Sequence, residues 1–166
     1  MKSLIIYYSL TGTTELVAYT LSEILHSDIV GVKDLKERND GFMNKLTSSY
    51  EAMREVKTTI DPMRIDISDY DLIYFGTPVW ASKPTPAIIT IIDRCDLRGK
   101  YVIPFATMSS NGGQSTIKRM SDKIKARGGK IVDSFTLRTK NKNDNDIIHD
   151  TETIIEILDL KMYHER

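Results

Sequence analysis

A cluster of hydroxyl-bearing residues around one glycine is the first place in this sequence that could carry chemistry. The segment reads Ser9, Leu10, Thr11, Gly12, Thr13 and Thr14, and a helical pattern of apolar residues begins near its end. Hydroxyls and backbone N–H groups at the positive end of a helix dipole suit an anion such as a phosphate monoester. Because the segment contains no Lys or Arg, such a site would bind through hydrogen bonds rather than countercharge. The alternative is an ordinary Ser/Thr helix cap with a glycine turn.

The spelling of this segment excludes two other phosphate-binding motifs. A nucleotide P-loop needs the pattern G-x-x-x-x-G-K-[ST], and the sequence contains no such string. A dinucleotide-binding turn needs G-x-G-x-x-G after a strand, and Gly12 has no partner glycines at that spacing.

The only tryptophan of the chain lies in a proline-rich segment that follows a second apolar run. That run ends at Gly76, and the segment contains Pro78, Val79, Trp80 and Ala81. Rigid prolines lower the entropy cost of presenting a large flat side chain, which favours stacking on a planar ligand. The alternative is that Trp80 simply covers the edge of the sheet.

A third segment combines small polar residues with a pair of glycines. Small residues let the edge of a ligand approach the backbone closely, although a plain polar loop has the same composition. The residues are Thr107, Met108, Ser109, Ser110, Asn111, Gly112 and Gly113.

The elements that must position these segments follow from the apolar pattern, because short apolar runs that alternate with amphipathic stretches are typical of a parallel α/β sheet. The three segments follow the first, third and fourth predicted strands, whose carboxyl ends meet at the edge where such sheets bind ligands. Residues 33–71 form a long crossover in which 42–56 have helical spacing. We predict strands over residues 3–8, 28–32, 72–75, 101–106 and 130–137, and helices over 13–26, 87–95, 112–127 and 146–163.

In these motifs and their order, the chain resembles a flavodoxin along nearly its whole length. The resemblance implies an α/β fold: a flavodoxin-like, doubly wound, five-stranded parallel sheet of order 2-1-3-4-5, with helices on both faces and one domain over 1–166. It also implies non-covalent FMN as cofactor, with the phosphate held by residues 9–14. Residues 78–81 and 107–113 would enclose the isoalloxazine ring. The chemistry would take place on the flavin, so no catalytic side chain is expected.

The sequence also departs from the electron carriers of that family. Those carriers are strongly acidic and have an aromatic residue in the loop after the fourth strand, whereas here the net charge is zero and residues 107–115 contain neither an aromatic nor a carboxylate. Lys83 is the only charged residue in the three segments. Two functions therefore stay open: an electron carrier that meets a redox partner protein, and an FMN-dependent NAD(P)H:quinone-type oxidoreductase with a small-molecule acceptor. A flavin-free binding module is the third alternative.

Composition excludes several other classes. Lys plus Arg and Asp plus Glu both number 23, so no overall field attracts nucleic acid or an anionic membrane. No apolar run approaches the roughly 18 residues of a membrane helix, and we expect a cytoplasmic protein. Cys95 is the only cysteine, which excludes an internal disulfide and a thiolate metal site, and no metal is expected.

Overall fold

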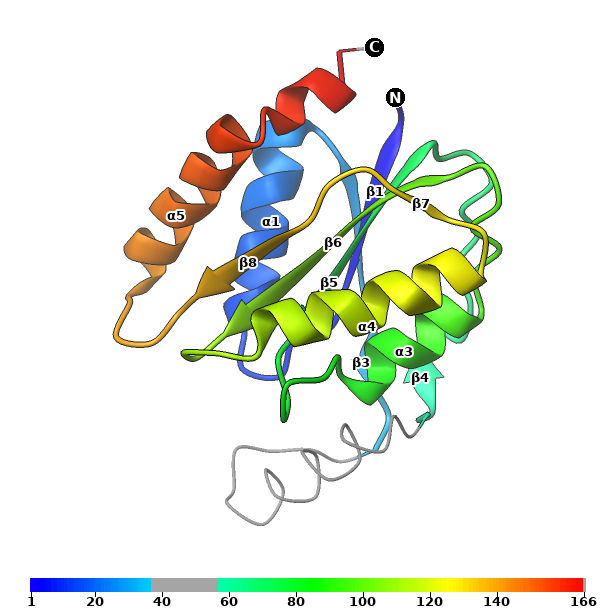
Figure 1. The fold of residues 1–166 in the computed structure, drawn as a ribbon, viewed down its shortest axis with the longest axis horizontal. Helices are drawn as coiled ribbons and strands as arrows, with labels where there is room; N and C mark the ends of the chain where they lie inside the picture. Colours follow the sequence, from blue (N-terminus) through cyan, green and yellow to red (C-terminus); the bar gives the residue numbers. More distant parts are fainter. Residues whose placement is uncertain (37–56, 166) are drawn as a thin grey trace.

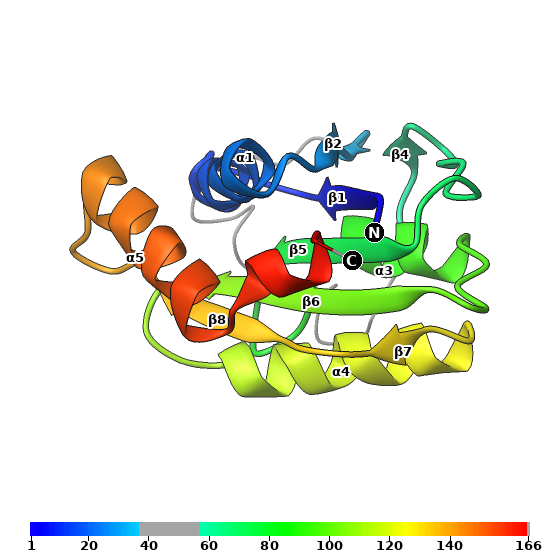
Figure 2. The same cartoon turned by 90° about the horizontal axis from the view of Figure 1, so that it is seen from above.

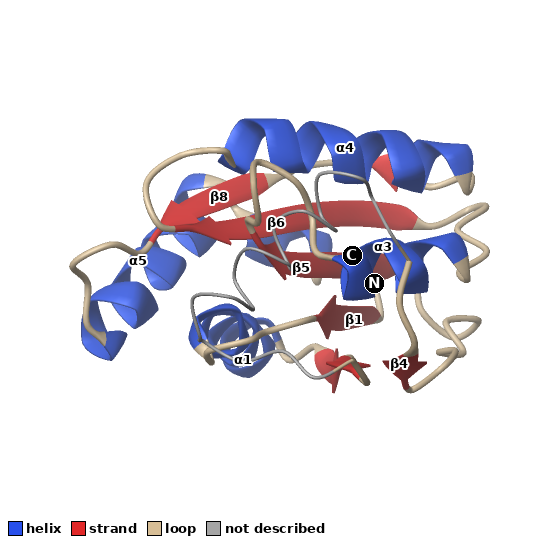
Figure 3. Ribbon diagram, turned by 90° about the horizontal axis from the view of Figure 1, so that it is seen from below, coloured by secondary structure: helices blue, strands red, loops and turns tan. Residues whose placement is uncertain are grey.

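The computed structural model describes residues 1–36 and 57–165. The predicted helix over residues 42–56 lies outside the described residues. The described part of the chain is a parallel sheet between two layers of helices (Figures 1 and 3).

The central sheet has the predicted order. Its strands run in the order β2-β1-β5-β6-β7, and β8 also pairs with β6. Every pairing in this sheet is parallel. With β7 and β8 taken as two parts of the last strand, the order is the predicted 2-1-3-4-5. The strands are β1 (Ser3–Tyr7), β2 (Asp28–Gly31), β5 (Leu72–Pro78), β6 (Tyr101–Met108), β7 (Lys130–Ile131) and β8 (Phe135–Arg138).

Helices cover both faces of the sheet, as predicted (Figure 2). The apolar stripes of α1 (Thr13–Leu25) and α5 (Asp144–Ile157) join one buried cluster, whereas α3 (Pro86–Asp93) and α4 (Gly113–Ala126) join the other. The predicted C-terminal helix is shorter than expected, and a separate 3₁₀ turn, η1 (Leu160–Tyr163), follows it.

The predicted strand over 130–137 is broken, and Pro104 explains the break. The N–H of Val132 donates to the carbonyl of Val102, so even-numbered residues of β6 face this neighbour. Pro104 is the next such residue, and it has no N–H to donate. The hydroxyl of Tyr163 donates to the carbonyl of Val132 at 3.3 Å and gives that oxygen a partner.

The pairing register records the same break. Tyr101 pairs with Lys130 on β7, whereas Phe105 pairs with Phe135 on β8, so one extra residue lies between the two strands. This is the arrangement of a β-bulge. The bulge leaves β8 paired with the last residues of β6, beside the carboxyl edge of the sheet.

The long crossover contributes a small second sheet that the sequence did not predict. Strands β3 (Lys33–Asp34) and β4 (Ile60–Asp61) pair antiparallel beside the main sheet. Strands β5 and β6 are longer than predicted, and their extra residues extend to Pro78 and Met108. These extensions carry two of the predicted ligand-binding segments to the edge of the sheet.

Candidate functional site

A cavity of about 370 Å³ lies at the carboxyl edge of the sheet. Its size is within the range of small-molecule sites, about 300–1,000 Å³. The walls come from all three predicted segments and from one further residue. The lining residues are Ser9, Leu10, Thr11, Thr13, Thr14, Pro78, Val79, Trp80, Ala81, Thr107, Met108, Ser109 and Thr139.

The first wall is the turn that leads from β1 into α1. Gly12 has a φ of 100°, a left-handed conformation that favours glycine, and its N–H donates to the hydroxyl of Ser9 at 3.0 Å. Within residues 1–36 and 57–165, no side chain caps the first N–H groups of α1. An ordinary Ser/Thr helix cap, the alternative for this segment, is therefore not what the turn forms, and the positive end of the helix dipole stays available to an anion.

Thr14 joins this turn to the second part of the site. Its hydroxyl lies 2.7 Å from the hydroxyl of Thr107, and the two residues are only 1% and 4% exposed. The pair links the first turn of α1 to the end of β6. The hydroxyl of Thr14 is thus engaged within the protein.

The wall that contains Trp80 is a tight two-residue turn. Trp80 and Lys83 exchange two backbone hydrogen bonds of 3.0 Å each, and Ala81 and Ser82 between them have φ values of 49° and 61°. Positive φ at both central positions is the signature of a type I′ turn, which usually contains Asn and Gly. The turn holds the indole at the cavity wall.

Trp80 also packs on the core. Its ring meets the ring of Tyr8 edge-on, with 5.7 Å between the centroids, and Tyr8 is 4% exposed. The N–H of Val79 donates to the carbonyl of Thr107 at 2.9 Å, which fixes this wall against β6. The two interpretations of Trp80, cavity wall and sheet cover, therefore both describe its position.

The third predicted segment is only partly at the cavity. Thr107, Met108 and Ser109 line it, whereas Ser110, Asn111, Gly112 and Gly113 do not. Gly12 of the first segment is likewise absent from the lining, because it forms the turn behind it.

The protein's own chain explains the glycine pair of that segment. A side chain at Gly112 would lie 2.9 Å from the hydroxyl oxygen of Ser82 and 3.0 Å from Val79 Cγ1. At Gly113 it would lie 2.7 Å from the sulfur of Met108. Gly112 also has a φ of 88°, so its conformation and its packing on the Trp80 turn account for this glycine, and packing against β6 accounts for Gly113.

Thr139 is a lining residue that the sequence analysis missed. It follows β8, and both its N–H (2.8 Å) and its hydroxyl (3.1 Å) donate to the carbonyl of Met108. The next residue, Lys140, donates its N–H to the carbonyl of Ser109 at 3.2 Å. The position after the fifth strand was a usable signal, because that strand also ends at the carboxyl edge of the sheet.

Among the residues that the structure describes, those that line the cavity carry no charged side chain. The nearest carboxylate on the first segment's helix is Glu15, which accepts a hydrogen bond of 2.8 Å from the hydroxyl of Tyr7. Burial, together with this carboxylate, raises the pKa of Tyr7 above its usual value. The site therefore offers hydroxyls, N–H groups and apolar surface.

Other reactive groups of the chain lie away from the cavity. Cys95 is buried, and burial raises the pKa of its thiol to about 11. Among residues 1–36 and 57–165, no group of three His, Cys, Asp or Glu side chains is placed to hold a metal ion. The helices in these same ranges are also too short or too polar to cross a bilayer.

The family profile described as flavodoxin matches residues 2–147 of the sequence. This chain belongs to the flavodoxin family. No relative matches this family member among the curated proteins.

Solved structures show the same fold in proteins of low sequence identity. A Bacteroides uniformis protein assigned as a flavoprotein has a TM-score of 0.76 and 24% identity, and the match covers 91% of this flavodoxin-family chain and 97% of the other. A second such protein, from Bacteroides eggerthii, has a TM-score of 0.75 and 22% identity, with coverage of 94% and 96%. A Lactobacillus acidophilus flavoprotein solved in complex with FMN has a TM-score of 0.67 and 25% identity, with coverage of 81% and 92%.

Proposed function

We propose that this chain binds FMN without a covalent link and transfers electrons through it. The observation that carries the proposal is the cavity, which joins the uncapped N-terminus of α1 to a wall formed by Trp80. The first part suits a phosphate and the second a flat aromatic ring. When bound, FMN supplies the redox chemistry, and the protein supplies binding and orientation.

The residues present fit the two ends of such a cofactor. The hydroxyls of Thr11 and Thr13, with the first N–H groups of α1, would hold the phosphate. Trp80 and Met108 would lie along the ring, and Thr139 would close the side next to β8. The Lactobacillus acidophilus protein, solved with FMN, supports this assignment through its shared fold and 25% identity.

A second candidate function is an FMN-dependent NAD(P)H:quinone-type oxidoreductase. The observation that favours it is the wall after β6, where Ser109 lines the cavity with a short, exposed side chain and residues 107–115 contain no aromatic ring. Such a wall leaves room for a nicotinamide or a quinone beside the flavin. A carrier and an oxidoreductase share the FMN site and differ in what reduces the cofactor.

The first experiment is a titration of the apoprotein with FMN and with riboflavin, which lacks the phosphate. We expect about one FMN per chain and far weaker binding of riboflavin, because the site at α1 then has no anion to bind. Equal affinities would contradict the phosphate assignment. If the apoprotein binds neither flavin, the remaining alternative is a flavin-free binding module.

The second experiment is stopped-flow mixing of the FMN-loaded protein with NADH or NADPH. The proposed carrier keeps its oxidised flavin absorbance on the timescale of turnover, because it receives electrons from a partner protein. Rapid loss of that absorbance would identify the oxidoreductase instead.

A further inference from the structure

Positive charge is concentrated on one side of the cavity, although the whole chain is neutral. The carboxyl ends of β5, β6 and β8, taken with the loops that follow them, span residues 78–85, 107–113 and 136–143. They contain Lys83, Arg138, Lys140 and Lys142 and no Asp or Glu. A local excess of one sign on a neutral protein produces a field that acts on nearby partners rather than at long range.

The backbone places three of these cations beside residues that line the cavity. Lys83 pairs with Trp80 across the two-residue turn, and Arg138 lies opposite Met108 in the sheet register. Lys140 donates its N–H to the carbonyl of Ser109. The three form what we call the cationic rim: Lys83, Arg138 and Lys140.

The rim lies outside the cavity, and the described residues provide it with no acidic partner. None of the three residues lines the cavity, and none forms an ion pair with another residue in the described part of the chain. Arg138 and Lys140 are exposed, and Lys83 is half-buried. Lys142 differs, because its ammonium is paired with the carboxylate of Asp150.

The opposite side of the phosphate-binding turn carries the other sign. Glu15 and Asp144 line a separate cavity of about 270 Å³ together with Thr11. The edge of the sheet thus carries the cations of β5, β6 and β8 on one side and the carboxylates of Glu15 and Asp144 at the N-termini of α1 and α5. A partner whose own charges are arranged in the complementary way would dock in one orientation.

We propose that the cationic rim is the docking surface for a redox partner protein that presents an acidic patch. The inference rests on the proposed function, because the rim lies beside one wall of the cavity in which the flavin would bind. A protein surface fits the geometry better than a nicotinamide nucleotide does. The three cations come from three separate segments and none of them lines the cavity, so an extended protein surface is the partner that could contact all three at once.

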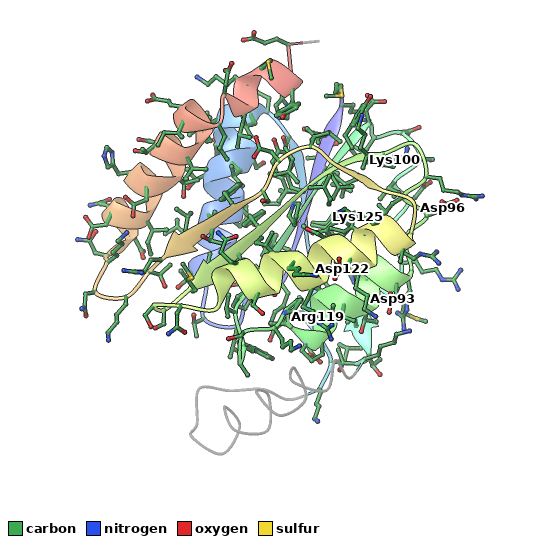
Figure 4. The ribbon with its side chains drawn as sticks, viewed as in Figure 1. Asp93, Asp96, Lys100, Arg119, Asp122 and Lys125 are labelled. Carbon is green, nitrogen blue, oxygen red and sulfur yellow. The ribbon has the colours of Figure 1, made fainter. Side chains whose placement is uncertain are left out.

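The direct test measures binding of a fluorescein-labelled oligoglutamate peptide by fluorescence anisotropy. The rim variant carries Lys83→Gln, Arg138→Gln and Lys140→Gln. The matched control variant carries Lys125→Gln, Lys130→Gln and Lys161→Gln, three exposed residues at or near the C-terminal end of α4, in β7 and in η1. Figure 4 labels Lys125 towards the end of α4 that is remote from the cavity.

We expect the peptide to bind the wild type and the control equally and the rim variant about tenfold more weakly at low salt, the lower end of electrostatic effects. The difference should shrink between about 0.01 M and about 0.15 M salt, where the Debye length falls from about 30 Å to about 8 Å. Equal weakening in both variants, or no binding to the wild type, would overturn the proposal. Displacement of the peptide by NADP⁺ would also overturn it, because the surface would then bind a nucleotide.

The rate at which charged small oxidants oxidise the reduced flavin tests the electrostatic field of the cationic rim. Two ferricyanide ions each accept one electron from one anionic flavin hydroquinone, which becomes oxidised flavin and releases one proton, and both become ferrocyanide. Salt should slow this anionic oxidant and accelerate the cationic hexaammineruthenium(III), and the rim variant should lose both responses. A wild type without these opposite responses would refute the docking surface, whereas a protein that takes up no FMN would refute the proposed function and leave the peptide result intact.

Discussion

Thr14 and Thr107 allow a sharp test of how the site is built. Their hydroxyls lie 2.7 Å apart, and both residues are almost fully buried. Replacing either with Val keeps the shape but leaves the other hydroxyl without its partner, which costs about 1–3 kcal/mol. Replacing both removes the two polar groups together and should cost far less than the sum of the single changes.

The assay is denaturant unfolding of the apoprotein for the wild type, the two single variants and the double variant. We expect each single variant to lower the midpoint at an unchanged slope, and the double variant to recover most of the loss. The coupling free energy from this cycle should then be about 1–3 kcal/mol. Thermal midpoints should show the same pattern, since 1 kcal/mol corresponds to about 2–4 °C in a chain of this length class.

Single-variant losses that simply add in the double variant would refute the hydroxyl pair. FMN affinity supplies a second check on the same proteins. If the Thr14 hydroxyl instead binds the phosphate, Thr14→Val alone weakens FMN binding and Thr107→Val does not. We expect the two single variants to change FMN affinity by similar factors, because both remove the same hydroxyl contact between α1 and β6.

Four further outcomes follow from the geometry. Thr11→Val should weaken FMN binding by about tenfold to a hundredfold, because a hydrogen bond to a charged group contributes about 1.5–3 kcal/mol. Titration of the variant with FMN measures this loss. The unfolding free energy of the apoprotein should not change. Trp80 is the only tryptophan, so the protein's tryptophan fluorescence should be quenched when FMN is added. Trp80→Ala should weaken FMN binding. Fluorescence that stays unquenched would contradict a position of the indole next to the flavin. The double change Ala81→Asn with Ser82→Gly should raise the unfolding free energy by about 1 kcal/mol, because both positions have positive φ, and chemical denaturation measures it. Burial lowers the pKa of His164 in the native protein. Just below a pH of about 6.5, the usual pKa of an unfolded histidine, the native ring is therefore still neutral while the unfolded ring binds a proton. The free energy of unfolding should therefore fall as the pH drops below about 6.5 until the native ring is also protonated, and His164→Gln should remove that dependence in unfolding curves measured at several pH values.

Much of the architecture was predictable because it depends on local patterns. The buried strands β1, β5 and β6 are nearly continuous apolar runs, and the helices between them have apolar stripes at helical spacing. The segments that line the cavity were predictable for a related reason. The residues that form the turn at Gly12 and the wall at Trp80 are unusual in type and immediately follow predicted strands.

The parts that were not predicted depend on contacts between distant segments. The break between β7 and β8 is set by Pro104, which lies in the neighbouring strand β6 and has no backbone N–H to donate to it. Thr139 reaches the cavity because it bonds to Met108, which lies 31 residues earlier in the chain. Gly112 and Gly113 show a different difficulty, because a glycine required by loop packing looks the same in a sequence as one required by a ligand.

Net charge is a poor guide to the electrostatics of this site. A chain with 23 basic and 23 acidic residues has almost no field at long range, so it cannot attract a partner from a distance. Within a Debye length of about 8 Å, however, the separate charges matter more than their sum. The cationic rim lies on one side of the entrance and Glu15 lies on the other, and an approaching surface meets both at once. On the proposed docking surface, such an arrangement would select the orientation in which a partner docks, as electron transfer to one edge of a bound flavin would require.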